Sequence, residues 1–94
     1  MILITTIKMK YTYQTQGTCS SQIDFELDGQ GVIQNVNFLG GCHGNLQGIS
    51  ILVRGMKATE AIAKLQGIRC GYKNTSCPDQ LATALQQALA TQKA

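Results

Sequence analysis

Residues 23–31, IDFELDGQG, contain the pattern that decides the fold. Over residues 23–28, isoleucine, phenylalanine and leucine alternate with three acidic residues, which is the period of a strand with one buried face. The glycines at positions 29 and 31 follow at once and predict a tight turn. Residues 32–38 then supply an apolar return strand, although Ile33 and the asparagines blur its alternation. The stretch predicts an antiparallel hairpin.

The residues before the hairpin show the same period. Ile7, Met9, Tyr11 and Tyr13 fall on one face of the segment 7–14, and polar side chains fall on the other. This alternation predicts a further half-buried strand.

After residue 41 the apolar period becomes helical. Three helices are expected, one from near Cys42 to just before Gly55, one from about Ala58 to Leu65, and one from about Pro78 onwards. Pro78 suits a first helical turn, and Ser76 or Cys77 can cap it. Strands followed by helices predict an α+β domain, in which a three-stranded antiparallel sheet is followed by helices packed on one face.

Length and composition place limits on the class of protein. The chain has 94 residues and one proline, so residues 1–94 are expected to form a single domain. Its start lacks the pattern of a secretory signal, and no apolar run is long enough to span a bilayer. We therefore expect a cytoplasmic protein with no membrane partner, in which cysteines serve metal binding or redox chemistry more often than disulfides. The net charge of +3 is scattered and forms no basic stripe, so nucleic-acid binding is not expected.

The four cysteines are the main candidates for a functional site. Cys19 precedes the second predicted strand and Cys42 follows the third, so antiparallel pairing should bring them to one end of the sheet. Cys42 and Cys77 both open predicted helices, where backbone N–H groups favour a thiolate. Cys70 lies in a glycine-flanked turn before the last helix, and that loop is long enough to fold back.

Two interpretations of these cysteines remain open on spacing alone. Zinc takes four soft ligands in a tetrahedron, which thiolates satisfy. The chain has no Cys-x-x-Cys pair, however, and buried inert thiols are equally compatible with the spacing. His43 could replace one thiolate as a ligand, or it could be a surface residue in a first helical turn. Arg54, Lys57, Arg69 and Lys73 flank the cysteines and are either a docking surface for an acidic partner or ordinary solvated charges.

Four motifs resemble a known family. Residues 75–82, TSCPDQLA, are similar to the signature for which the TSCPD domain family is named. Residues 17–21 (GTCSS), 40–46 (GGCHGNL) and 67–71 (GIRCG) resemble the same family. The resemblance extends from about residue 10 to about residue 90.

The resemblance implies a function. In that family the domain occurs as the C-terminal part of adenosylcobalamin-dependent ribonucleotide reductases and as small free-standing proteins. The resemblance implies one zinc site formed by Cys19, Cys42, Cys70 and Cys77, and an accessory or regulatory role beside a ribonucleotide reductase or another larger protein. Nothing in these 94 residues resembles the reductase catalytic domain or a cobalamin site, so no ribonucleotide reduction by this chain alone is implied.

A more distant similarity concerns the NifU/IscU iron–sulfur scaffold proteins. The order of elements is similar, with Cys19, Cys42 and Cys77 at the places of the three scaffold cysteines. Ser21 and Ser76 replace the aspartate and histidine of that family, and Cys70 is an added thiol. This similarity implies an alternative function as an iron–sulfur cluster scaffold or carrier. A second alternative is a dithiol redox partner that uses Cys70 and Cys77.

Overall fold

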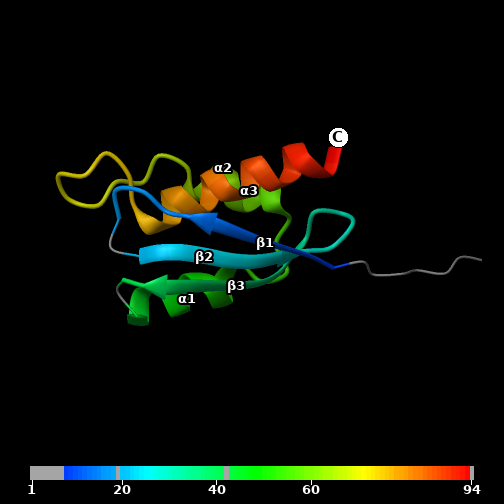
Figure 1. The fold of residues 1–94 in the computed structure, drawn as a ribbon, viewed down its shortest axis with the longest axis horizontal. Coiled ribbons are helices and arrows are strands. Elements are labelled where there is room, and N and C mark those ends of the chain that lie inside the picture. Colours follow the sequence, from blue (N-terminus) through cyan, green and yellow to red (C-terminus); the bar gives the residue numbers. More distant parts are fainter. Residues whose placement is uncertain (1–7, 19, 42, 94) are drawn as a thin grey trace, which may run out of the picture.

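The computed structural model describes residues 8–18, 20–41 and 43–93. Within these residues the chain forms three strands and three helices, in the order β1 (Met9–Gln14), β2 (Ser20–Leu27), β3 (Ile33–Gly40), α1 (His43–Val53), α2 (Ala58–Leu65) and α3 (Cys77–Lys93) (Figure 1). The α+β class predicted from the sequence is confirmed. In the described part of the chain, no helix combines the length and the apolar character that crossing a bilayer requires.

The sheet is antiparallel throughout, with β2 between β1 and β3. Strand β1 alternates as predicted, because Met9, Tyr11 and Tyr13 are half-buried and the residues between them are exposed. Tyr11 lies opposite Phe25 of β2, and their rings stack with centroids 5.3 Å apart. Such cross-strand aromatic pairs stabilise a sheet and fix its register.

The hairpin between β2 and β3 is closed by Asp28. Its carbonyl oxygen accepts a hydrogen bond from the Gly31 N–H at 3.1 Å. Its carboxylate Oδ1 accepts two more from the N–H groups of Gln30 and Val32, each at 2.9 Å. Gly31 has a φ of +80°, a conformation that glycine adopts without strain. The predicted turn is therefore confirmed.

A bulge explains why the alternation of β3 is blurred. Ile33 pairs with Leu27 and Asn35 pairs with Glu26, so Gln34 is an extra residue on this strand. The extra residue lets both Ile33 and Val36 face the core although they are three positions apart.

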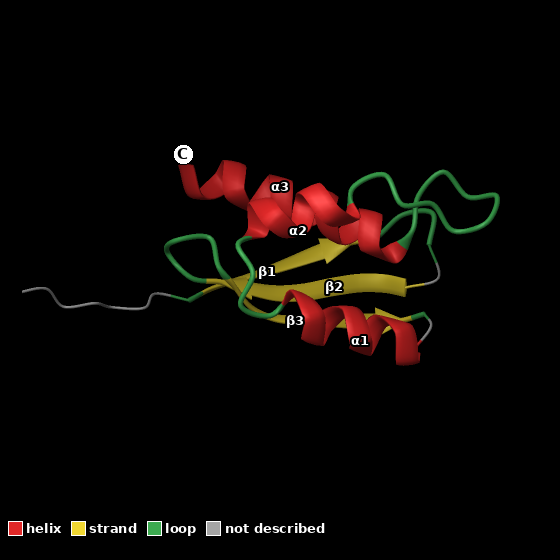
Figure 2. Cartoon of the chain, turned by 180° about the vertical axis from the view of Figure 1, so that it is seen from behind, coloured by secondary structure: helices red, strands yellow, loops and turns green. Residues whose placement is uncertain are grey.

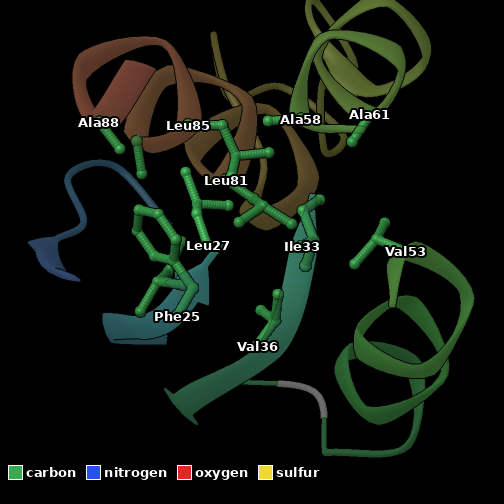
Figure 3. Packing of buried hydrophobic residues seen from close by; sticks show 12 residues of the cluster. Phe25, Leu27, Ile33, Val36, Val53, Ala58, Ala61, Leu81, Leu85 and Ala88 are labelled. Carbon is green, nitrogen blue, oxygen red and sulfur yellow. The ribbon is translucent and has the colours of Figure 1, made fainter. Parts of the chain in front are cut away.

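The helices cover one face of the sheet, as predicted. Figure 2 shows α1 alongside β3, with α2 and α3 covering the part of the sheet nearer β1. The buried cluster joins side chains from β2, β3 and all three helices (Figure 3), namely Ile23, Phe25, Leu27, Ile33, Val36, Val53, Ala58, Ala61, Leu81, Ala84, Leu85 and Ala88. The opposite face is polar, where for example the Thr12 hydroxyl donates to the Asp24 carboxylate at 3.0 Å.

Candidate functional site

The site predicted from the cysteines lies at the end of the sheet where β2 begins and β3 ends. Ser20, which directly follows Cys19, pairs with Gly40, which is two residues before Cys42. Gly40 and Gly41 have φ values of +80° and +83°, which suit glycine in the turn from β3 towards α1. Figure 1 shows the beginnings of α1 and α3 at this same end.

Cys77 is the first residue of α3 and is buried, with 6% of its surface exposed. Its Sγ lies 3.0 Å from the Oγ of Ser20, whose side chain is also buried. The Ser20 hydroxyl is in turn 3.3 Å from the Oγ1 of Thr18. This contact joins the beginning of α3 to the strand residue next to Cys19. It is a tertiary contact that no local pattern in the sequence indicated.

The residues around Cys77 form a hydrogen-bonded helix start. The Oγ of Ser76 accepts a hydrogen bond from the Asp79 N–H at 3.1 Å, so Ser76 is the N-cap of α3. The Ser76 hydroxyl also donates to the carbonyl oxygen of Ile68 at 2.6 Å. Pro78 costs the first turn no hydrogen bond, because the first N–H groups of a helix have no partner within it. Of the two caps allowed by the sequence, the structure selects Ser76.

Asp79 ties the helix start to the end of α2. Its carboxylate accepts hydrogen bonds from the Thr75 hydroxyl and from the Gly67 N–H, the latter at 2.7 Å. The Thr75 hydrogen bond, followed by that from Gly67 and by the charge of Arg69, lowers the pKa of Asp79 below its ordinary value, and partial burial opposes them. As an acidic residue in the first turn of α3, Asp79 also suits the positive end of the helix dipole. Its bond to Gly67 joins residues twelve positions apart, so no local spacing in the sequence indicated it.

Cys70 lies in the loop between α2 and α3, and its side chain is exposed. Its N–H donates to the carbonyl oxygen of Thr75 at 3.2 Å, and its carbonyl accepts from the Lys73 N–H at 3.0 Å. Together with the bonds that Gly67 and Ile68 make to Asp79 and Ser76, these contacts attach the Cys70 loop to the beginning of α3. The predicted folding back of the loop towards the helix start is thus present in its backbone, whereas the thiol of Cys70 is at the surface.

Gln80 is a further residue that the sequence did not single out. Its side chain is buried, and its Oε1 accepts a hydrogen bond from the Gln16 N–H at 3.0 Å. Its Nε2 donates to the Oγ1 of Thr75 at 3.1 Å. Gln80 therefore fastens the β1–β2 connection to α3, immediately before the segment that contains Cys19.

The structure describes only some of the predicted metal ligands. Cys19 and Cys42, and the side chain of the alternative ligand His43, lie outside the described residues. Among the residues that the structure describes, no three histidine, cysteine or acidic side chains are grouped so that they could hold a metal ion. The four-cysteine set thus remains a prediction, to which the structure adds the positions of Cys70, Cys77 and the residues beside the other two.

The basic residues that flank the cysteines are exposed. Arg54, Lys57, Arg69 and Lys73 all have exposed side chains. Arg69 acts on the Asp79 carboxyl through its charge.

Comparison with known proteins places the chain in a family. The model of the family described as the TSCPD domain matches residues 5–89, which is most of the chain. Neither a curated protein nor a solved structure matched it, so the similarity to the NifU/IscU architecture stays a prediction. The matched range includes the Thr75–Asp79 segment, in which the serine caps α3 and the aspartate ties it to Gly67. The chain belongs to the TSCPD domain family.

Proposed function

We propose that the chain is a zinc-binding accessory module, in which Cys19, Cys42, Cys70 and Cys77 hold one zinc ion and the domain docks on a larger protein of the ribonucleotide reductase type. The zinc site is the part of the proposal with the most direct support.

The observation that carries the proposal is the contact between Cys77 and Ser20. Because Ser20 follows Cys19 and pairs with Gly40, the Cys77 sulfur lies next to the chain segments that lead to both Cys19 and Cys42. Described neighbours of Cys19 and Cys42 are thereby in contact with each other and, through Ser20, with Cys77. Thiols brought together without a metal would add little to the free energy of folding, whereas four thiolates complete the tetrahedral coordination of one zinc ion.

The loop that contains Cys70 supports the fourth ligand. Backbone groups of four residues of this loop, Gly67, Ile68, Cys70 and Lys73, are hydrogen-bonded to the helix start or within the loop. These hydrogen bonds hold the backbone of Cys70 against the beginning of α3 and leave its side chain at the surface. The exposed Cys70 thiol can change rotamer without unfolding the loop.

The chemistry fits a structural site better than a catalytic one. A closed shell of four thiolates leaves zinc no open position for water or substrate. Binding free energy at such a site adds to the free energy of folding, which a small domain needs. Four thiolates on a divalent ion also offset part of the net charge of +3.

Metal analysis of anaerobically purified protein tests the zinc site. We expect about one zinc per chain and slow alkylation of all four thiols, followed by fast alkylation once the protein is unfolded with chelator. Cys77→Ser should lose most of the zinc and Cys70→Ser should hold it more weakly. Ser21→Ala, a change at an exposed hydroxyl beside Ser20, should retain it. Less than about half an equivalent of zinc, with four reactive thiols, would refute the site.

The same sample separates the two alternative functions. Reconstitution with iron and sulfide should give a coloured cluster that transfers to an apo-acceptor if the chain is an iron–sulfur scaffold. A reversible disulfide between Cys70 and Cys77, with a low-pKa thiol found by alkylation against pH, would instead support a dithiol redox partner.

A further inference from the structure

A groove runs between the outer edge of β3 and one side of α1. Its volume is about 580 Å³, within the range of known ligand sites of roughly 300–1,000 Å³. Residues 35–38 and Gly40 of β3 form one wall, and Gln47, Ile51 and Arg54 contribute to the other. In Figure 2, α1 runs alongside β3, on the side of the sheet away from β1.

The strand edge in this groove is available for pairing. Ile33, at the beginning of β3, exchanges hydrogen bonds of 2.8 Å with Gly55 and Met56 on its outer side. From Asn35 to Gly40, no further segment of the described chain pairs with that edge. The strand also contains no charged residue and no proline, the usual devices that keep an edge strand from pairing, whereas the edge strand β1 contains Lys10.

The helix presents a second stripe to the groove. Leu46, Ser50 and Val53 form the inward stripe of α1 and are buried. Gln47 and Ile51, with Arg54 in the turn directly after the helix, are offset by one residue with the same spacing, so they form a parallel stripe beside the strand edge. Ile51 is 58% exposed, although it is aliphatic. No acidic side chain occurs among the described residues that line the groove, so Arg54 has no counter-charge there.

We propose that this groove binds an extended segment of a partner protein, which adds to β3 as a fourth strand and carries a carboxylate for Arg54. The backbone of the strand edge supplies the hydrogen bonds, and Ile51 supplies an apolar contact for alternate side chains of the segment. A second copy of this chain is a poorer occupant, because it brings an identical groove with its own Arg54 and no carboxylate. The inference rests on the accessory role proposed above, but it does not depend on the zinc site.

Peptide titration followed by NMR tests the groove. The probes are two synthetic peptides of about seven residues, the length of an ordinary strand. Both alternate valine with a charged or polar residue, and they differ only in having glutamate or lysine at the charged positions. Added to the ¹⁵N-labelled full chain, the glutamate peptide should shift the amide signals of residues 35–40 and of Ile51 and Arg54. The lysine peptide should bind at least about fivefold more weakly than the glutamate peptide.

Three variants make the test specific. Ile51→Glu should weaken binding of the glutamate peptide at least about fivefold, whereas Leu52→Glu, which places the same charge on the adjacent exposed residue outside the groove, should not. Arg54→Glu should reverse the preference towards the lysine peptide, and this reversal remains measurable if Ile51→Glu fails to fold.

Three results would overturn the proposal. The first is the absence of amide shifts at about 1 mM glutamate peptide. The second is an equal loss of binding in Ile51→Glu and Leu52→Glu. The third is a dimer in analytical ultracentrifugation that Ile51→Glu dissociates, which would assign the edge to a second copy. Because zinc content is measured separately, failure here is distinguishable from failure of the metal site.

Discussion

Helices α1 and α3 both begin at the cysteine end of the sheet, yet they are stabilised very differently. Helix α3 has a serine cap and an anchored aspartate at its start, and it buries Leu81, Ala84, Leu85 and Ala88 in the core. Helix α1 has no acidic residue in its first turn, contributes Val53 to that core, and leaves Ile51 and Leu52 exposed.

The difference separates two roles within one small domain. Interior packing and a satisfied helix end make α3 a rigid support for the residue that begins it, Cys77. Helix α1 buries Leu46 and Val53 on one side and leaves Ile51 and Leu52 exposed on the other, so it keeps an apolar side for another molecule. The predictions below test this division.

The largest expected effect comes from the packing of α3. Leu81 is fully buried between the sheet and the helices. Leu81→Ala should lower the free energy of unfolding by about 2 to 5 kcal/mol, because it removes buried apolar atoms and leaves a cavity. Urea denaturation followed by circular dichroism measures the change. A loss below about 1 kcal/mol would mean that α3 is not the helix on which the fold depends.

The cap of α3 should have the next largest effect. Ser76→Ala removes the acceptor for the Asp79 N–H and the donor to the Ile68 carbonyl. A loss of about 1 to 2 kcal/mol is expected in the same denaturation experiment. Thr91→Ala, which removes an exposed hydroxyl from the last turns of the same helix, is the matched control and should be nearly neutral. Equal effects in the two variants would contradict the assignment of Ser76 as the cap.

The carboxylate of Asp79 predicts a dependence of stability on pH. Because hydrogen bonds from Thr75 and Gly67 lower its pKa in the folded state, its stabilising contribution is present above the ordinary value of 3.8 and is lost as the pH falls through the lowered value. The difference in unfolding free energy between the wild type and Asp79→Asn should therefore shrink below pH 3.8. We expect a smaller effect than that of the cap, because the asparagine oxygen can still accept from Gly67.

The titration of Asp79 can also be followed directly. In a ¹³C NMR titration, Thr75→Val should move the pKa of Asp79 back towards its ordinary value, since the Thr75 hydroxyl is the largest cause of the shift. An unchanged titration curve in Thr75→Val would show that this hydroxyl does not set the pKa.

The smallest effect is expected on the exposed side of α1. Leu52 is 75% exposed, so Leu52→Lys should change the free energy of unfolding by no more than about 0.5 kcal/mol. Thermal unfolding of the purified protein measures it. A loss comparable to that of Leu81→Ala would show that α1 is part of the core of an assembly and would remove the contrast between the two helices.

Much of the fold could be predicted because its signals are local. The alternation in β1 and β2, the turn after Leu27, and the beginning and end of α2 all follow from patterns within a few residues. The prediction was less complete for β3, because its bulge depends on the register with β2 and not on its own sequence. The cap of α3 was narrowed to two residues, and only the hydrogen bond from Asp79 distinguished them.

The sequence by itself determined the order of elements, the buried faces of β1 and β2, the family, and the four cysteines to consider. The tertiary structure decided what local patterns cannot encode, namely that Cys77 meets Ser20, that Asp79 holds Gly67, and that Cys70 is at the surface while Cys77 is buried. It also revealed the groove beside Ile51. These features join residues that are far apart in the chain or lie on separate elements, so their positions depend on how the helices pack on the sheet.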